Sequence, residues 1–325
     1  MKKGIKRLIF WGILMAIAFA FCVTAVSAAN FPTRPMDIAV GFAAGGANHM
    51  AAENLRIGAQ EVFGMPLTVT PRPGAASAIA NSFVAMQPSD GYNLLNGTLS
   101  LQISMFTGDV DYTVDDFIAV FMYSEVVPCL AIRANLPIYT LQDLVDWVKA
   151  NPGTFAWGHS GVASTLHLAG CLMFDTLGII DSILEVPFTG TPEAITQVVG
   201  GHLDAVISFP ASIQEQVRAG NLRVLGTTSD VAPAEFPDAL TFREQGFDAV
   251  LTSTRGIFVR SDTPKEIIDI LEDGFAKIVQ SEEFREAAIA LGEPPIFLNS
   301  ADATALYMEQ YETIGILVEM LGLAH

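Results

Sequence analysis

Residues 36–49 read MDIAVGFAAGGANH, an apolar segment that runs into small residues with two adjacent glycines. The pattern predicts a β-strand, a loop and the start of a helix. The first N–H groups of a helix have no partner within it, so a helix that begins in such a loop favours an anion. A second stretch of this kind, GHSGVASTLH, occupies residues 158–167. Two such loops predict a cleft that holds a small acid from both sides.

Short apolar segments alternate with helical ones along the chain, which is typical of α/β folds. We expect strands at 36–42, 67–71, 92–98, 117–125, 128–134, 154–158, 183–188, 204–209, 222–228 and within 249–260. We expect helices at 48–63, 75–86, 140–150, 163–177, 191–200, from 210 to Gly220, and at 264–279, 281–291 and 301–321. Thr140, with Asp143 completing a capping box, and Thr191, followed by Pro192, are the expected N-caps of two helices.

The alternation predicts mainly parallel sheets flanked by helices, and ligands of such sheets bind beyond the carboxyl ends of the strands. We expect one lobe from residues 30–126 with 254–325, and a second lobe from residues 127–253. Extended crossings near 126–132 and 250–256 would form the hinge, because paired crossings favour closure on a ligand.

The first residues have the pattern of an export signal. A basic start at 2–7 is followed by an apolar stretch from Leu8 to Val26 and by small residues up to Ala28. We expect cleavage after Ala28, so that residues 1–28 are a signal peptide. The alternative is an uncleaved anchor, since the apolar stretch is long enough to span a bilayer.

The chain has 17 basic and 35 acidic residues and a formal net charge of −18. This acidity opposes binding to nucleic acids, which requires basic surface, and to anionic membranes. It does not exclude an anionic ligand, because exposed charges are screened within roughly 8–10 Å at physiological salt.

Cysteines and histidines point to neither a disulfide framework nor a metal site. Cys129 and Cys171 either pair in an oxidising compartment or stay buried thiols, and the sequence leaves both open. The five histidines form no H-E-x-x-H motif, and no pair has a zinc-site spacing with an acidic partner, so we expect no metal and no cofactor. His167 is expected to be a packed structural residue.

Nucleophilic catalysis is the alternative to binding. The stretch GHSGV at 158–162 differs from the G-x-S-x-G elbow at Val162, and His167 follows Ser160 too closely for the usual order of a triad. We therefore expect no enzyme and keep an exported serine hydrolase as the alternative.

Candidate ligand contacts lie in the two loops or at strand ends on the same edge of the predicted sheets. From the first lobe they are Phe42, Ala43, Gly45, Gly46, Ala47, Asn48, His49, Thr98 and Ser100. From the second lobe they are Ser160, Gly161, Ser164, Thr165, Phe188, Thr189, Gly190 and Ser208.

Six stretches in order carry a resemblance to a known family: 31–49, 71–77 (PRPGAAS), 90–95 (DGYNLL), 158–170, 186–207 and 218–229. The chain resembles the substrate-binding proteins of tripartite tricarboxylate transporters, the Bug or TctC-like proteins. The resemblance implies a two-lobed periplasmic-binding-protein-like fold of type II. It implies a monomeric periplasmic receptor that carries a small organic carboxylate to integral membrane transporter subunits. It also places that carboxylate between 43–48 and 160–165, held by backbone amides and water.

Departures from the family pattern bear on the ligand. His49 stands where the family has Asp, Gly41 where it has Pro, and Pro71 where it has Asn. A histidine can donate or become cationic, so an amino-acid ligand loses a partner and a second carboxylate gains one. We expect a di- or tricarboxylate or an aromatic acid. The sequence does not separate transport from a sensor that presents its ligand to a signalling partner.

Overall fold

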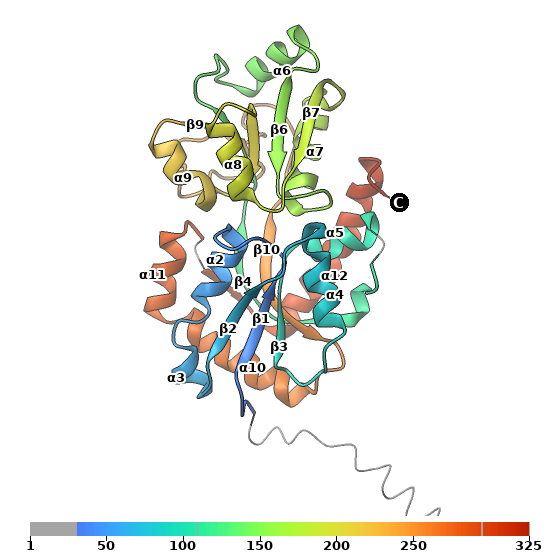
Figure 1. Ribbon diagram of the computed structural model, residues 1–325, viewed down its shortest axis with the longest axis vertical. Helices are drawn as coiled ribbons and strands as arrows, with labels where there is room; N and C mark the ends of the chain where they lie inside the picture. Colours follow the sequence, from blue (N-terminus) through green and yellow to red (C-terminus); the bar gives the residue numbers. More distant parts are fainter. Residues whose placement is uncertain (1–30, 109, 294, 325) are drawn as a thin grey trace, which may run out of the picture. The chain divides into compact units, whose positions relative to one another are not determined.

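The computed structural model describes residues 31–108, 110–293 and 295–324, which form two mixed β-sheets flanked by helices (Figure 1). The expected export signal lies outside these residues. The first sheet has the strand order β11 (Pro295–Leu298), β4 (Phe117–Val126), β10 (Ser253–Arg260), β3 (Asn93–Gly97), β1 (Met36–Val40) and β2 (Leu67–Pro71). The second sheet has the order β7 (Ile183–Pro187), β6 (Phe155–His159), β8 (Ala205–Ser208), β5 (Cys129–Arg133) and β9 (Leu222–Thr227).

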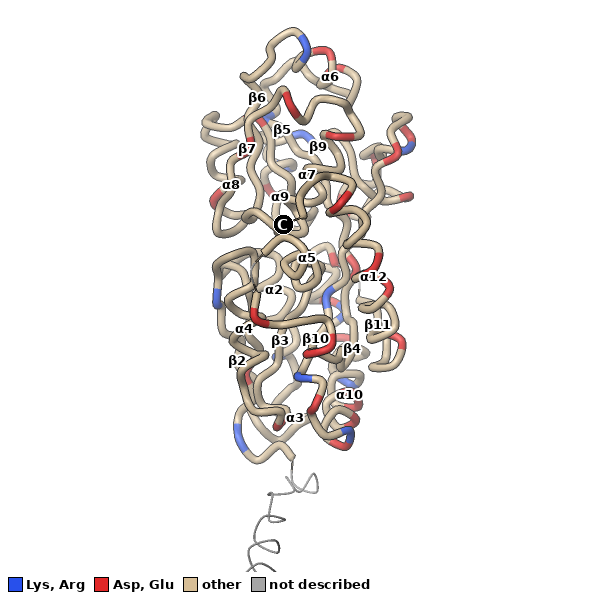
Figure 2. The backbone as a smooth tube through the Cα atoms, turned by 90° about the vertical axis from the view of Figure 1, so that its right-hand side faces the viewer, with Lys and Arg blue, Asp and Glu red and all other residues tan. Residues whose placement is uncertain are grey.

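Helices connect and cover both sheets. Those in the chain segments that form the first sheet are α2 (Ala47–Asn54), α3 (Ala59–Phe63), α4 (Ala78–Ala85), α5 (Ser100–Thr107), α10 (Lys265–Val279), α11 (Glu282–Ala290) and α12 (Ser300–Met320). Those between strands of the second sheet are α6 (Leu141–Ala150), α7 (Thr165–Thr176), α8 (Thr191–Val199) and α9 (Pro210–Arg218). Acidic residues occur along helices and loops around both sheets (Figure 2).

The α/β prediction is confirmed, but the expectation of mainly parallel sheets is wrong. Strands β1, β2 and β3 pair in parallel, as do β6, β7 and β8. Strand β10 is antiparallel to both β3 and β4, and β5 is antiparallel to both β8 and β9. The chain crosses from the first sheet to the second just before β5, and it returns just before β10. Each of these strands therefore enters its sheet at the end where its neighbours finish, and it runs antiparallel to them.

The two crossing segments lie together. Ser253 at the start of β10 is the partner of Val126 at the end of β4. The hydroxyl of Thr228 donates to the carbonyl of Leu251 at 2.7 Å, and the Thr228 N–H donates to the carbonyl of Pro128 at 3.1 Å. Thr228 therefore bonds to both crossing segments, at the places where the sequence predicts a hinge. The lobe boundaries and the hinge motion stay predictions.

Two expected helices begin or end differently. The helix expected at 48–63 is broken into α2 and α3, because the chain turns at Gly58 with φ of 72°. The helix expected from 75 begins at Ala78 and follows a short 3₁₀ turn with left-handed residues. Helix α5 and strand β11 were not expected, because each is short and weakly patterned. The capping box of Thr140 and Asp143 is confirmed.

Cys129 and Cys171 are both buried and free, so of the two alternatives the structure contains separate thiols. No helix within the described residues combines the length and the hydropathy that a bilayer crossing requires.

Candidate functional site

A cavity of about 190 Å³ lies between loops that follow strands of the two sheets. Its lining residues are Gly41, Phe42, Gly74, Ala75, Ala76, Ser160, Gly161, Val162, Phe188 and Thr189. Sequence reasoning placed Phe42, Ser160, Gly161, Phe188 and Thr189 at the site, and it missed the other five. The volume is below the roughly 300–1,000 Å³ of pockets for drug-sized ligands, so the space suits a small molecule.

Residues 74–76 form a wall of this cavity that the sequence did not reveal, and Ser77 continues the same strained segment. Their φ angles are 133°, 44°, 49° and 88° in order. A left-handed conformation costs an L-residue roughly 1–2 kcal/mol, and such strain gathers at functional sites. A Cβ at Gly41 would lie 2.5 Å from the Cα of Ser77. Glycine at position 41 therefore allows this strained segment to pack directly against the end of β1.

Helix α2 follows the loop that contributes Gly41 and Phe42 to the cavity, and its first N–H groups are open. Its N-cap is Gly46, and no side chain of the described residues caps it or places an acid in its first turn. Asn48 was expected to cap this helix or to touch the ligand. Its Oδ1 instead accepts a hydrogen bond of 2.6 Å from the Nε of Arg255. The side chain of Asn48 is thus bound within the first sheet.

Helix α8 presents a second start without a side-chain cap, as far as the structure describes the chain. The expectation that Thr191 is its N-cap is wrong, because the N-cap is Gly190, with φ of −175°, and Thr191 is already helical. A Cβ built on Gly190 would lie 3.0 Å from the Cβ of Ala43, and one on Gly46 would lie 3.8 Å from the Cδ of Pro192. The N-terminus of α2, which packs on the first sheet, therefore contacts the N-terminus of α8, which packs on the second.

Helix α7, the expected second anion site, is closed by its own surroundings. The Oγ of Ser164 accepts from the N–H of His167 at 3.1 Å. The N–H of Thr165 donates to the Oγ of Ser100 at 3.0 Å, which links α7 beside the second sheet to α5 beside the first. Ser160 donates to the Oγ of Ser164 at 3.1 Å. The open helix start on the second sheet is that of α8 and not that of α7.

Two further expected contacts, Thr98 and Ser208, are buried and do not line the cavity. The hydroxyl of Thr98 accepts from the N–H of Ser100 at 3.3 Å. Ser208 donates to the carbonyl of Phe209 at 3.2 Å. These side chains hold the strand ends in place.

Two histidines and a glutamate lie close together at the loop of residues 158–167. Oε1 of Glu185 lies 2.9 Å from Nε2 of His159 and 3.4 Å from Nε2 of His167. The sequence shows no zinc-site spacing among the histidines, and Glu185 joins His159 and His167 only through the parallel pairing of β7 with β6. These hydrogen bonds hold the pKa of Glu185 far below its usual range. Burial lowers the pKa of His159 despite the nearby carboxylate.

The three groups offer ligand atoms within 4.8 Å of one another, as a metal ion needs. However, the N–H of Ala163 donates to Nδ1 of His167 at 3.1 Å. That bond requires a lone pair on Nδ1, so the neutral ring carries its proton on Nε2 and cannot ligate a metal there. The donor set in this arrangement does not fit a metal ion.

A larger hollow of about 680 Å³ lies between α9, β9 and residues 235–239. It shares no residue with the cavity between the loops, and neither glycine-containing loop borders it. Size alone would favour this hollow, but the convergence of two open helix starts favours the smaller cavity.

Comparisons with known proteins agree with this architecture. A protein of Cupriavidus necator encoded in the gbd 5' region is 28% identical over 317 residues, which are 95% of this chain and 94% of the relative. The periplasmic binding protein BugD has a TM-score of 0.85 and 23% identity, over 90% of this chain and 99% of the BugD chain. MatC from Rhodopseudomonas palustris, solved with bound malate, has a TM-score of 0.82 and 22% identity, over 89% of this chain and 100% of the MatC chain.

The family model of the tripartite tricarboxylate transporter family receptor, TctC, matches residues 51–323. That range includes both sheets apart from the first strand, together with the helices α7 and α8 that border the site. This chain therefore belongs to the tripartite tricarboxylate transporter receptor family.

Proposed function

We propose that this protein captures a small organic carboxylate in the cavity between its two sheets. The observation that carries the proposal is the meeting of two helix N-termini, α2 and α8, near a small cavity. An anion at a helix N-terminus gains roughly 0.3–1 kcal/mol from each helix at exposed sites and more where water is excluded.

The cavity favours a carboxylate without an amino group. Among the described residues that line it, none is charged. An anion therefore meets amide N–H groups, hydroxyls and ordered water, which are good partners for a carboxylate. An ammonium group would find no carboxylate there. A di- or tricarboxylate or an aromatic acid is thus preferred over an amino acid, and malate, which MatC holds, is a suitable first probe.

His49 was expected to favour a ligand with a second carboxylate, and we now propose no direct contact between His49 and the ligand. Its Nδ1 lies 3.4 Å from the N–H of Gly45, and its Nε2 lies 3.7 Å from Oε1 of Glu53. Both ring nitrogens thus face protein groups, and His49 is not among the residues that line the cavity. The preference for acids rests on the cavity lining rather than on His49.

Capture would proceed by closure of two lobes, residues 30–126 with 254–325 and residues 127–253. Support comes from the direct bonds between Ser100 and Thr165 and from the crossings tied by Thr228. In the cell, we propose that the protein acts in the periplasm and delivers its ligand to integral membrane transporter subunits, in keeping with its family.

A hydrolase finds little support. Among the described contacts of Ser160, its hydroxyl donates to Ser164 and has no histidine partner. A general base must lie within hydrogen-bond reach of the group that it activates. We therefore propose a receptor without enzyme activity.

Isothermal titration calorimetry tests the proposal with malate, citrate, benzoate and glutamate. A matched control is malamide, the diamide of malate, which keeps the shape and loses both charges. We expect binding of at least one acid, no binding of malamide, and weaker binding of glutamate. Bound acid also raises the melting temperature by mass action. Tight binding of glutamate with no binding of the other acids would overturn the ligand class.

A further inference from the structure

The two loops beside the cavity share one hydrogen-bond arrangement. In the second loop, Ala163 has φ of 65° and immediately precedes the N-cap Ser164. The N–H of Ala163 donates to Nδ1 of His167, the third helical residue of α7, at 3.1 Å. Nε2 of the same ring faces Glu185 at 3.4 Å. The ring is therefore held between the loop backbone and a carboxylate.

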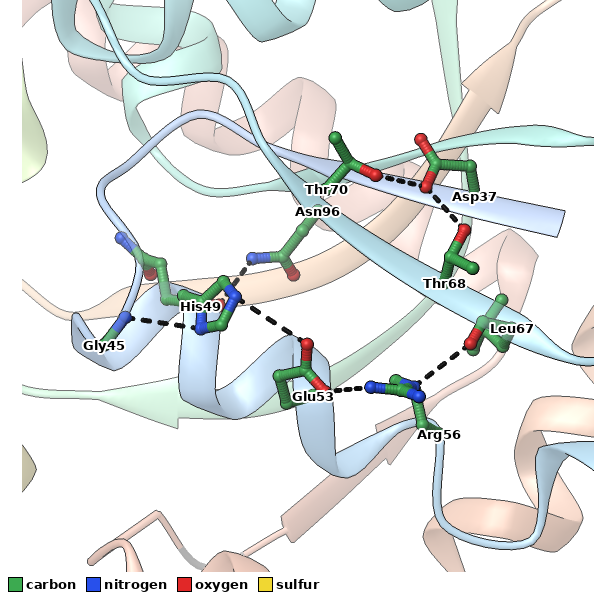
Figure 3. A network of polar contacts seen from close by, with 10 residues as sticks. Asp37, Gly45, His49, Glu53, Arg56, Leu67, Thr68, Thr70 and Asn96 are labelled. Carbon is green, nitrogen blue, oxygen red and sulfur yellow. Dashed lines mark hydrogen bonds and ion pairs between the residues drawn. The ribbon is translucent and has the colours of Figure 1, made fainter.

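The first loop repeats this arrangement with different residues (Figure 3). Gly45 has φ of 79° and immediately precedes the N-cap Gly46. Its N–H lies 3.4 Å from Nδ1 of His49, the third helical residue of α2. Nε2 of His49 faces Glu53 at 3.7 Å, and Glu53 in turn accepts from Arg56 at 2.7 Å. In both loops the histidine is the third helical residue, its Nδ1 faces the N–H of a loop residue, and its Nε2 faces a carboxylate.

The direction of these bonds fixes the state of each ring. A backbone N–H can only donate, so Nδ1 must carry a lone pair. A neutral imidazole then has its proton on Nε2, and a carboxylate opposite Nε2 favours that tautomer. Each histidine accepts from a residue whose backbone is left-handed, a conformation that costs an alanine more than a glycine.

The second loop has a further restraint. Nδ1 of His159 lies 3.1 Å from the carbonyl of Gly161, and its Nε2 meets the same Glu185 oxygen as His167 does. The rings of His159 and His167 have centroids 4.9 Å apart, and the ring of Trp157 lies 4.8 Å from that of His159. The buried rings of Trp157, His159 and His167 therefore support the backbone of residues 160–162, which lines the cavity.

We propose that His49 and His167 are positioning residues that fix the two loops of the ligand site through their Nδ1 atoms, while Glu53 and Glu185 select the required tautomer. This inference rests on the proposed carboxylate binding and adds what keeps the two loops in the binding shape. Neither histidine touches the ligand. In the first loop, His49 then serves as an acceptor for the loop backbone.

The ring states are tested directly by ¹⁵N NMR of histidine side chains in the full chain at neutral pH, with His49→Gln and His167→Gln used to assign the signals. We expect both rings to be neutral with the proton on Nε2. A proton on Nδ1 of His167 overturns the inference. Binding of Zn²⁺ through Nε2 of His167, seen as a shift of that nitrogen, also overturns it. This readout needs no ligand, so it stands apart from the test of the proposed function.

Matched variants test the effect on binding. Asparagine places an oxygen near the position of Nδ1, whereas glutamine places its amide near Nε2. We expect His167→Gln to weaken malate binding about tenfold, the value of one lost hydrogen-bond restraint, and His167→Asn to retain most of the affinity. His49→Gln and His49→Asn repeat the comparison on a more exposed ring, in case the buried variant fails to fold.

His202→Gln is the control, because His202 is exposed and lies outside the site. Equal losses in the asparagine and glutamine variants at both positions would overturn the inference. Absence of malate binding by the unmodified protein, with the expected ring states, would instead count against the proposed ligand.

Discussion

A methyl group added at Gly41 tests how the strained wall of the cavity is held. In Gly41→Ala, the new Cβ would lie 2.3 Å from the Oγ, 2.4 Å from the Cβ and 2.5 Å from the Cα of Ser77. Rotation of the Ser77 side chain relieves the first contact only. The Cα is backbone, so residues 74–77 must move away from β1.

The cost follows from packing. Overpacking of a close-packed interior costs about 1–3 kcal/mol, and the displacement spreads because Ser77 donates to Asn81, which donates to Tyr112. Each kcal/mol lowers the melting temperature by about 2–4 °C in a domain of 150–250 residues. Malate binding should fall at least about tenfold, which is 1.4 kcal/mol, because the displaced segment lines the cavity.

Calorimetry of unfolding and of malate binding, on the same preparation, measures both effects. The control is Gly58→Ala, where the new Cβ meets open space but φ is 72°, so stability falls while affinity stays. The double variant Gly41→Ala with Ser77→Gly removes two of the three contacts and should recover part of the loss. Native stability and native affinity of Gly41→Ala would refute the packing argument.

Three further predictions concern other parts of the site. Gly161→Ala should weaken malate binding more than it lowers stability, since Gly161 has φ of 108° and its Cβ would lie 3.3 Å from the carbonyl of Phe188; equal binding in a titration would contradict this. The hydrogen bond from His159 is the first cause of the low pKa of Glu185. The folded protein therefore gains stability at pH values above the pKa of an unfolded glutamate, about 4.3, and it loses this stability as the pH falls below that value. Glu185→Gln should therefore flatten the acid side of a plot of melting temperature against pH, and an unchanged acid side would be the contrary result. Burial raises the pKa of Cys171 to about 12, so this thiol should react with a disulfide reagent only after unfolding, and rapid labelling of the native protein would be inconsistent with its burial.

Local signals in the sequence predict the parts of the fold that depend on local chemistry. The strand, loop and helix of 36–49 follow from an apolar run that leads into small residues with two adjacent glycines. The start of α6 follows from Thr140 and Asp143, which satisfy each other's backbone within one turn. Such elements need no knowledge of distant residues.

Other features depend on contacts between distant segments. The left-handed residues 74–77 contain alanine and serine, which give no sign of positive φ, and their position is set by packing on Gly41. Glu185 joins the two histidines only because β7 pairs with β6. The N–H of Thr165 was expected to face a ligand, but Ser100, 65 residues earlier, accepts from it.

The central claim is that an anion binds in the cavity beside the N-termini of α2 and α8. The most direct test is the ¹H–¹⁵N spectrum of the protein during a titration with malate. The largest shifts are expected at the amides of Ala47 and Asn48 in α2 and of Thr191 in α8. Shifts confined to residues 217–224 and 235–239, which border the larger hollow, would contradict the claim.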